Sequence, residues 1–362
     1  KTLLHSAKLY DHALDSAAYG VTAESVRVDH AAVIARKERV IKTLVGGVCA
    51  AMKASGVTTV NGRAVITGKD PAGYSVKANG DRYVGKNLII ATGSESVLPP
   101  IEGLRESLNS GFAVTNRELL FSCEAPKRLV VVGGGVIGLE MASYYQMTGT
   151  AVTVVEMMDH IAGPCDKDLV KLLQKNYERG GMRFELNACV KVIGNSRVLC
   201  QRGGETFDLE ADRVLVALGR RPNSQDLGLE SIGVLLENGA VRTDCHMRTN
   251  VPGIYAVGDI NGKSMLAHTA YREAEVAVHT ILGQKDTMSY RAIPSVLYTI
   301  PELSSVGLTE EEAKAQGLDV AVVRIPMAYS GRYVAENENG DGIFKLVIDK
   351  KLRTVVGAQV LA

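Results

Sequence analysis

Short apolar runs recur along the chain and predict buried strands. The clearest run is Leu-Val-Val-Val at 129–132, after which apolar side chains return at helical spacing over 139–147. Gly149 ends that helix, and the apolar run at 151–155 predicts a second strand. A strand, a glycine-rich turn, a helix and another strand in this order predict a parallel α/β fold.

The same patterns divide the rest of the chain. Apolar residues at helical spacing predict helices at 1–18, 29–55, 166–180 and 266–282, and one that begins at the capping box of Thr309 and Glu312. Strands are predicted at 57–60, 64–67, 74–78, 82–84, 86–91, 212–218 and 254–257, and 182–201 is strand-rich. From residue 293 the pattern becomes antiparallel, with strands predicted at 295–299, 303–307, 320–325, 343–349 and 355–360.

Composition limits the class of protein. The 362 residues are 46% hydrophobic and 22% charged, which predicts two or three ordinary globular domains. The formal charge of +1 argues against nucleic-acid binding and against an anionic membrane surface. No apolar stretch is long enough to span a bilayer, and no signal peptide is visible. The six cysteines are scattered without zinc or C-x-x-C spacing, so we expect reduced thiols, an intracellular protein and no metal site.

The glycines after the first strand form a G-x-G-x-x-G motif made of Gly133, Gly135 and Gly138. Gly133 allows the tight turn, Gly135 lets a pyrophosphate approach the backbone, and Gly138 lets the helix pack closely. The helix N-terminus supplies N–H groups and a partial positive charge to the phosphates. The alternative is a glycine-rich packing turn of another α/β fold.

Glu156 ends the second strand, about 20 residues after the glycines, and is expected to accept hydrogen bonds from the adenosine ribose. A 2′-phosphate beside this carboxylate would be repelled. Residues 157–165 contain no arginine or lysine that could bind such a phosphate. The sequence therefore predicts NAD rather than NADP.

An ordered set of motifs covers the whole chain, at 91–94, 133–138, 219–223, 255–259, 266–268 and 293–302. This set resembles the flavin-dependent pyridine nucleotide–disulfide oxidoreductases, and within them the dihydrolipoamide dehydrogenases. The resemblance implies an α/β protein with two Rossmann-like nucleotide-binding domains and a C-terminal α+β interface domain. Its FAD domain (1–114 and 249–292) is split by an inserted NAD domain (115–248), and the interface domain (293–362) follows.

The resemblance also implies roles for single residues. Lys1 would lie beside the flavin and Glu140 would pair with it; a carboxylate one turn into an apolar helix needs a partner, unless it faces solvent. The implied FAD site is Lys1, Ala64, Thr92, Gly93, Ser94, Asp259, Met265, Leu266, Ala267 and His268. Within it, Asp259 would hold the ribityl chain, and the backbone around His268 would stabilise negative charge on reduced flavin. The implied NAD site is Gly133, Gly134, Gly135, Val136, Ile137, Gly138, Glu156, Val190, Ala217 and Gly219, with Arg220 or Arg221 at its mouth.

The implied reaction is the oxidation of dihydrolipoamide to lipoamide with NAD⁺, through FAD and a redox disulfide. Neither chain end shows a helix cap or a strand terminator, so we expect both ends to be cuts. The resemblance implies that the first FAD motif, the redox cysteines and the catalytic histidine–glutamate pair lie beyond them. Activity is thus expected of the full-length protein and not of this stretch alone. The implied partners are a second copy of the chain and, through lipoyl domains, a 2-oxo-acid dehydrogenase or glycine cleavage complex, in the cytoplasm or the mitochondrial matrix.

Three other interpretations stay open. A sibling such as glutathione or mercuric reductase typically uses NADP, so Glu156 counts against it. A soluble NAD(P) transhydrogenase lacks the full disulfide pair, and the sequence does not exclude it. The third is a module that binds NAD without turnover.

Overall fold

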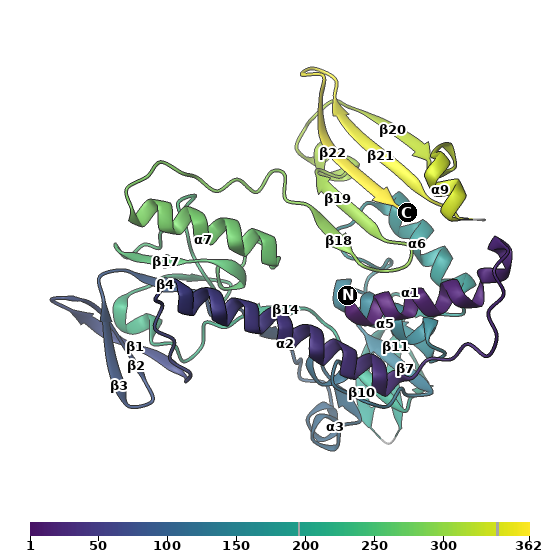
Figure 1. Ribbon diagram of the computed structural model, residues 1–362, viewed down its shortest axis with the longest axis horizontal. Helices are drawn as coiled ribbons and strands as arrows, with labels where there is room; N and C mark the ends of the chain where they lie inside the picture. The colour runs from purple at the N-terminus through teal and green to yellow at the C-terminus, as the bar shows by residue number, and fades with distance from the viewer. Residues whose placement is uncertain (195, 338–339) are drawn as a thin grey trace. The chain divides into compact units, whose positions relative to one another are not determined.

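The computed structural model describes residues 1–194, 196–337 and 340–362 (Figure 1). Its contacts divide the chain into two compact units, which are treated separately. The larger unit comprises Lys1–Gly47, Leu98–Gly219 and Pro294–Ala362, and the smaller unit comprises Val48–Val97 and Arg220–Ile293. The first 47 residues, which the resemblance assigns to an FAD domain, thus pack within the larger unit. The division into FAD, NAD and interface domains stays a prediction.

A five-stranded parallel sheet, in the order β6-β13-β7-β8-β9, organises the larger unit. β7 (Arg128–Val132) and β8 (Ala151–Val155) pair in parallel along their length and confirm the two strands predicted there. β13 (Arg213–Val216) confirms the middle of a third predicted strand. The other strands are β6 (Ala113–Val114) and β9 (Arg183–Glu185).

Both faces of this sheet are covered. Leu129 and Val131 pack with buried residues of the helices α1 (Thr2–Leu14), α5 (Val136–Met147) and α6 (Lys167–Arg179). Val130 and Val132 form a second core with residues of the opposite layer. That layer comprises α3 (Leu104–Ser110) and an antiparallel sheet of β10 (Cys189–Gly194), β11 (Arg197–Arg202) and β12 (Glu205–Glu210). Burial on both faces explains why the strand at 128–132 is continuously apolar.

The last part of the larger unit is an antiparallel sheet in the order β18-β19-β22-β21-β20, as the change of pattern at residue 293 predicts. The strands are β18 (Ser295–Leu297), β19 (Leu303–Gly307), β20 (Val320–Pro326), β21 (Ile343–Asp349) and β22 (Thr354–Leu361). The capping box of Thr309 and Glu312 is present at the start of α8 (Glu310–Ala315). In Figure 1, α6 lies against this sheet, and its contacts are with β22. The remaining helices of the unit are α4 (Asn116–Leu119), α9 (Gly331–Glu336) and the first part of α2 (His30–Ala54), with 3-10 turns at Ser16–Tyr19 and Met327–Tyr329.

The described part of the smaller unit contains short sheets, the last part of α2 and the helix α7 (Ala267–Ile281). A three-stranded antiparallel sheet is formed by β1 (Ala64–Asp70), β2 (Gly73–Ala78) and β3 (Asp81–Gly85). The same unit contains three separate two-stranded sheets. These are β4 (Leu88–Ile90) with β17 (Ile254–Ala256), β5 (Ser94–Ser96) with β14 (Arg220–Pro222), and β15 (Leu236–Glu237) with β16 (Ala240–Val241). The 3-10 turns are Leu229–Ile232 and Gly258–Asn261.

The strand predicted at 57–60 is wrong. These residues form no strand, and Val57 and Val60 are 49% and 43% exposed. All four residues are β-branched, which favours a strand, but a strand requires a neighbour to pair with, and the antiparallel sheet begins only at Ala64. Among the described residues, no helix has the length and apolarity needed to cross a membrane.

A cluster of ion pairs joins α8 to the C-terminal sheet. Glu310 accepts hydrogen bonds from Lys314 at 2.6 Å and from Arg324 at 2.6 Å, and it lies 3.1 Å from the ammonium group of the buried Lys345. The hydrogen bond from Lys314, followed by those of Lys345 and Arg324, lowers the pKa of Glu310 from 4.5 to about 2. The carboxylate therefore stabilises the folded state only while it is ionised.

This shift predicts how stability depends on pH. A carboxyl whose folded-state pKa is depressed contributes stability above its unfolded pKa and loses it as pH falls through the folded value. We expect Glu310→Gln to cost roughly 1–3 kcal/mol at neutral pH. The free energy of unfolding of this variant should also change less than that of the natural protein between roughly pH 5 and pH 2.

Urea unfolding followed across this pH range measures both effects. The exposed Glu311, the next residue of α8, gives the control variant Glu311→Gln. Equal pH slopes in Glu310→Gln and the natural protein would show that Glu310 does not titrate in this way.

Candidate functional site

The glycine turn lies between β7 and α5. Gly133 has φ +105°, and a Cβ at this position would lie 2.5 Å from the carbonyl oxygen of Ala217. A Cβ on Gly138 would lie 2.2 Å from the carbonyl oxygen of Gly133. Side chains are therefore excluded at both positions, because real Cβ atoms do not approach a carbonyl so closely. The first turn of α5 can pack on the end of β7 only because Gly138 has no side chain.

Gly135 differs from the other two glycines, because no atom lies within 4 Å of the place where its Cβ would be. Its missing side chain leaves open space in front of the backbone. α5 begins at the next residue, Val136, so the N–H groups of Val136, Ile137 and Gly138 have no carbonyl partner within the helix. Open space before a helix N-terminus suits a phosphate group.

Glu156 lies directly at this turn. Its Oε2 accepts the N–H of Gly134 at 2.7 Å, and its Oε1 accepts the N–H of Met158 at 2.9 Å. The carboxylate thus ties the glycine turn to the end of β8. Each oxygen has a second lone pair, so a ribose hydroxyl can still donate to it.

Two further residues of the predicted NAD site lie in the larger unit. Ala217 stands behind the glycine turn, as its contact with Gly133 shows. Val190 lies in β10, opposite Cys200 of β11. Arg220, by contrast, belongs to the smaller unit, where its guanidinium donates to the Oγ of Ser94 at 2.7 Å and to the Ser94 carbonyl at 2.5 Å.

Several residues predicted for FAD meet around Ser94 in the smaller unit. Ser94 donates to Asp259, which lies in the turn after β17, while Arg220 donates to Ser94. Thr92 and Gly93 are held by Asn223: the Thr92 hydroxyl donates to the Asn223 carbonyl, and the Asn223 N–H donates to the Gly93 carbonyl, both at 2.9 Å. The chain of hydrogen bonds fixes Asp259 relative to the loop at 92–94.

Two other predicted FAD segments begin elements of the same unit. Ala64 is the first residue of β1. Met265 and Leu266 precede α7, and Ala267 and His268 are its first two residues. The start of α7 thus agrees with the helix predicted at 266–282, and the role of these residues toward FAD stays a prediction.

Glu273 was not among the predicted site residues, but its carboxylate is bonded to Gly258, the residue before Asp259. Glu273 is 0% exposed; it accepts the N–H of Gly258 at 2.5 Å and the hydroxyl of Tyr290 at 2.7 Å. Burial, then the bond to Glu273, raises the pKa of Tyr290, so Tyr290 stays a donor. Glu273 lies three and four residues before the buried Val276 and Ala277, so it shares their face of the helix. This spacing was the signal in the sequence that could have predicted its burial.

Nearby, Asn261 has a buried side-chain amide nitrogen without a hydrogen-bond partner among the described residues. A buried donor of this kind costs free energy unless an acceptor meets it. A phosphate or sugar oxygen at this turn would meet that need, so the residues present fit a dinucleotide here.

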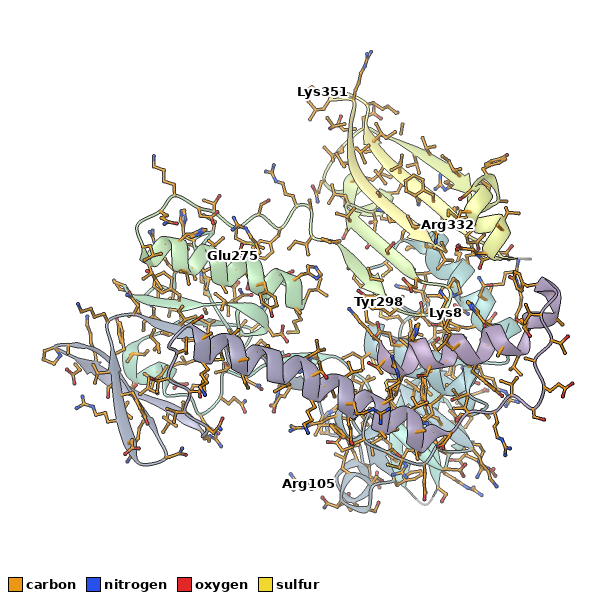
Figure 2. All side chains as sticks on the ribbon, viewed as in Figure 1. Lys8, Arg105, Glu275, Tyr298, Arg332 and Lys351 are labelled. Atoms are coloured by element: carbon orange, nitrogen blue, oxygen red, sulfur yellow. The ribbon has the colours of Figure 1, made fainter. Side chains whose placement is uncertain are left out.

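Lys1 and Glu140 converge on Tyr298, which follows β18 and is labelled in Figure 2. The Nζ of Lys1 lies 3.8 Å from the centre of the Tyr298 ring. The Oε1 of Glu140 accepts the N–H of Tyr298 at 3.0 Å. Glu140 therefore has a backbone partner, and the flavin-side role of the pair stays a prediction. Tyr298 lies within the motif at 293–302, but the sequence analysis assigned it no role of its own.

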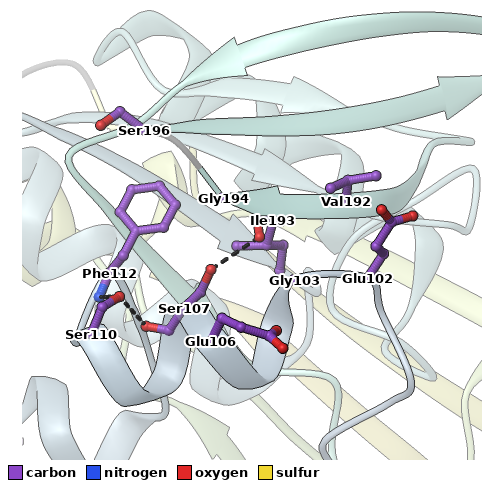
Figure 3. Close-up of a pocket in the computed structure, with 10 residues that line it drawn as sticks. All are labelled: Glu102, Gly103, Glu106, Ser107, Ser110, Phe112, Val192, Ile193, Gly194 and Ser196. Atoms are coloured by element: carbon purple, nitrogen blue, oxygen red, sulfur yellow. Dashed lines mark hydrogen bonds between the residues drawn. The ribbon is translucent and has the colours of Figure 1, made fainter.

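A pocket of about 500 Å³ lies elsewhere, between α3 and β10 (Figure 3). None of the predicted site residues lines this pocket, whose lining residues are Glu102, Gly103, Glu106, Ser107, Ser110, Phe112, Val192, Ile193, Gly194 and Ser196. The Ser107 hydroxyl already donates to the Ile193 carbonyl at 3.0 Å. All six cysteines are free thiols, and the described residues hold no group of three or more metal-ligating side chains.

Known proteins resemble the chain over its whole length. The family model described as pyridine nucleotide-disulphide oxidoreductase matches residues 1–274, and the model of that family's dimerisation domain matches residues 293–362. A dihydrolipoyl dehydrogenase from Bacillus subtilis is 37% identical over 99% of this chain and 77% of the relative. The mitochondrial dihydrolipoyl dehydrogenase of Sus scrofa is 34% identical over 100% of this chain and 72% of the relative.

Two solved structures have a similar fold. The HOCl-induced flavoprotein disulfide reductase RclA from Escherichia coli has a TM-score of 0.86 at 26% identity, covering 100% of this chain and 79% of that one. LpdA from Mycobacterium tuberculosis has a TM-score of 0.88 at 25% identity, with the same coverage.

These matches confirm the predicted fold class and the predicted cofactors, FAD and NAD. The dimerisation-domain match supports a homodimer. The chain belongs to the pyridine nucleotide–disulphide oxidoreductase family.

Proposed function

We propose that the protein is an NAD-linked flavoenzyme that oxidises dihydrolipoamide to lipoamide. One observation carries the choice of nucleotide: the Glu156 carboxylate lies at the glycine turn, bonded to the Gly134 N–H at 2.7 Å. A 2′-phosphate would meet its negative charge, and residues 157–165 provide no arginine or lysine to compensate. The relatives named dihydrolipoyl dehydrogenase, 34–37% identical over nearly the whole chain, support the substrate class.

The residues of the larger unit would bind and orient the nucleotide. Gly135 leaves room for the pyrophosphate, and the N-terminus of α5 offers it N–H donors. Glu156 would accept the ribose hydroxyls and so fix the adenosine half. These contacts hold the nucleotide still while its nicotinamide end reacts.

The residues of the smaller unit would bind FAD, which supplies two-electron transfer between thiols and a nicotinamide. Asp259, held by Ser94, would accept hydrogen bonds from the ribityl hydroxyls. The amide of Asn261 would donate to an oxygen of the same ligand. The N-terminus of α7 would stabilise negative charge.

Thiol–disulfide exchange is assigned to none of the six cysteines described here. Burial raises the pKa of Cys165 to about 11 and that of Cys200 to about 12, so both stay protonated thiols near neutral pH. The thiolate is the nucleophile in disulfide exchange, and a protonated buried thiol is inert. Cys165 and Cys200 are therefore unsuited to form the redox disulfide.

Two partners belong to the proposal. The first is a second copy of the chain, joined through the dimerisation domain. The second is a lipoyl domain of a 2-oxo-acid dehydrogenase or glycine cleavage complex, because such a domain carries dihydrolipoamide. The proposed compartment is the cytoplasm of a bacterium or the mitochondrial matrix; one similar protein is bacterial, and another is named mitochondrial.

A second candidate function is reduction of another disulfide, which the likeness to the Escherichia coli flavoprotein disulfide reductase favours. A soluble transhydrogenase is a further member of this group of alternatives. Both differ from the first proposal in the electron donor or acceptor that they use.

The first test is turnover by the full-length flavoprotein. We expect NADH to form from dihydrolipoamide and NAD⁺, with kcat/KM for NAD⁺ at least about 100-fold above that for NADP⁺, since one carboxylate bars the 2′-phosphate. Parallel assays with NADPH and glutathione disulfide, and with NADPH and NAD⁺, test the alternatives. A preference for NADP⁺, or turnover confined to one of these parallel assays, would refute the proposal.

The second test changes the carboxylate at the turn. Glu156→Gln keeps the shape but removes the charge, so KM for NAD⁺ should rise roughly tenfold or more and the discrimination against NADP⁺ should shrink. Steady-state kinetics with both nucleotides measure this. The exposed Glu178, in α6, supplies the control Glu178→Gln, which should behave as the natural enzyme does. Unchanged discrimination in Glu156→Gln would assign nucleotide choice to other residues.

The third test concerns Glu140. Glu140→Gln retains an acceptor for the Tyr298 N–H and removes only the negative charge. If Glu140 lies beside the flavin, the absorbance spectrum or the rate of flavin reduction should change while NADH affinity stays within about twofold of the natural value. Stopped-flow absorbance and an NADH titration separate the two effects. Identical spectra and reduction rates would limit Glu140 to its bond with Tyr298.

A further inference from the structure

A lysine of the C-terminal sheet is bonded to the segment that leads into α6. We propose that Lys345 is a positioning residue for the pyridine nucleotide: it anchors residues 157–166 and, through them, holds the glycine turn in its binding conformation. This inference rests on the proposed nucleotide site. It adds to that site a residue of the antiparallel sheet that begins after residue 293.

Lys345 forms one end of the connection. Its side chain is 1% exposed, and its Nζ donates to Asp166 at 2.7 Å and to Asp168 at 2.8 Å. Asp166 is 0% exposed at its side chain and also caps α6, because its Oδ1 accepts the N–H of Asp168 at 3.0 Å. A buried carboxylate without a cation is costly, so the position of Asp166 depends on Lys345.

Ala162 forms the other end. Its N–H donates to the carbonyl oxygen of Gly134 at 2.8 Å, and its neighbour Ile161 is fully buried. Ala162 has φ +60°, a left-handed conformation that costs free energy for a residue with a Cβ. Such a conformation persists only where the surrounding structure holds it. Only three residues separate Ala162 from Asp166, so the lysine anchor and the strained residue belong to one short segment.

The segment reaches the binding groups through Gly134. The carbonyl of Gly134 accepts from Ala162, and its N–H donates to Glu156 at 2.7 Å. The next residue, Gly135, borders the open space for the pyrophosphate. A bound nucleotide would find these groups already placed, which lowers the entropic cost of binding. Releasing the anchor should therefore weaken nucleotide binding and leave the chemistry of the other substrate unaffected.

A purely structural ion pair would give a different result. It would lower the melting temperature, but any folded protein would bind NADH normally. The two roles are thus separated by nucleotide affinity measured on folded variants.

The experiment uses the full-length flavoprotein and two variants. Lys345→Met removes the cation, and Asp166→Asn keeps the helix cap and the shape but weakens the bond to Lys345. Lys350→Met is the matched control, because Lys350 follows the same strand and pairs with Asp319 in an exposed ion pair at 2.7 Å. NADH dissociation constants come from fluorescence titration, and KM values come from turnover with NAD⁺ and dihydrolipoamide.

We expect both site variants to bind NADH about 2- to 30-fold more weakly. Their KM for NAD⁺ should rise, whereas KM for dihydrolipoamide and kcat at saturating NAD⁺ should stay within about twofold of the natural values. Lys350→Met should match the natural protein throughout. Should Lys345→Met fail to fold, Asp166→Asn decides the question, since its cap and volume are preserved.

The outcomes are distinguishable from those that test the function. Natural protein that binds no NADH refutes the proposed function itself. Natural protein that binds NADH, together with a folded Lys345→Met or Asp166→Asn that binds it equally well, overturns this inference alone. An equal loss of affinity in Lys350→Met would overturn it too, because the effect would then not come from the buried anchor.

Discussion

The close approach of Gly138 to the carbonyl of Gly133 is the contact on which the nucleotide site depends. At 2.2 Å from that oxygen, no Cβ can be placed, so α5 can start immediately after β7 only with glycine at this position. That start aims the N-terminus of the helix at the open space beside Gly135. The end of β8 then lies beside the turn, which is why Glu156 can reach the Gly134 N–H. Every binding group of the site follows from this one steric constraint.

Three glutamates share one structural role, although they lie in different elements. Glu156 accepts the Gly134 N–H, Glu140 accepts the Tyr298 N–H, and Glu273 accepts the Gly258 N–H. In each case a carboxylate holds the backbone of a distant segment; Glu140 and Glu273 lie in helices, and Glu156 directly follows β8. Hydrogen bonds with an ionised acceptor are stronger than neutral ones, so they suit loops that must keep one conformation. The loops held in this way are those expected to contact the cofactors.

The patterns along the chain predicted elements well where the signal is local. The apolar strand at 129–132, the glycine turn, the strand at 151–155 and the capping box at Thr309 all appear as expected. The strand expected at 57–60 does not form, because β-branched residues favour an extended backbone but do not provide a neighbouring strand to pair with. The resemblance supplied the residues expected around the flavin, and the structure shows hydrogen bonds among Ser94, Asp259 and Arg220.

The sequence by itself determined the strand–turn–helix–strand unit, the acid that ends it and the family to which the chain belongs. The unit and its acid depend on residues close together in the chain, where spacing and side-chain size decide the geometry. The family follows from the order of motifs along the whole chain. Only the tertiary structure decided that Glu273 binds the Gly258 N–H, that Tyr298 contacts both Lys1 and Glu140, and that Lys345 binds Asp166. The shortest of these contacts joins Glu273 to Gly258, 15 positions apart, and the longest joins Lys1 to Tyr298, 297 positions apart. They form because buried charges and backbone groups need hydrogen-bond partners, and the packed chain can supply these from any part of the sequence. The spacing of apolar and polar residues along one element does not indicate which distant residue will be the partner.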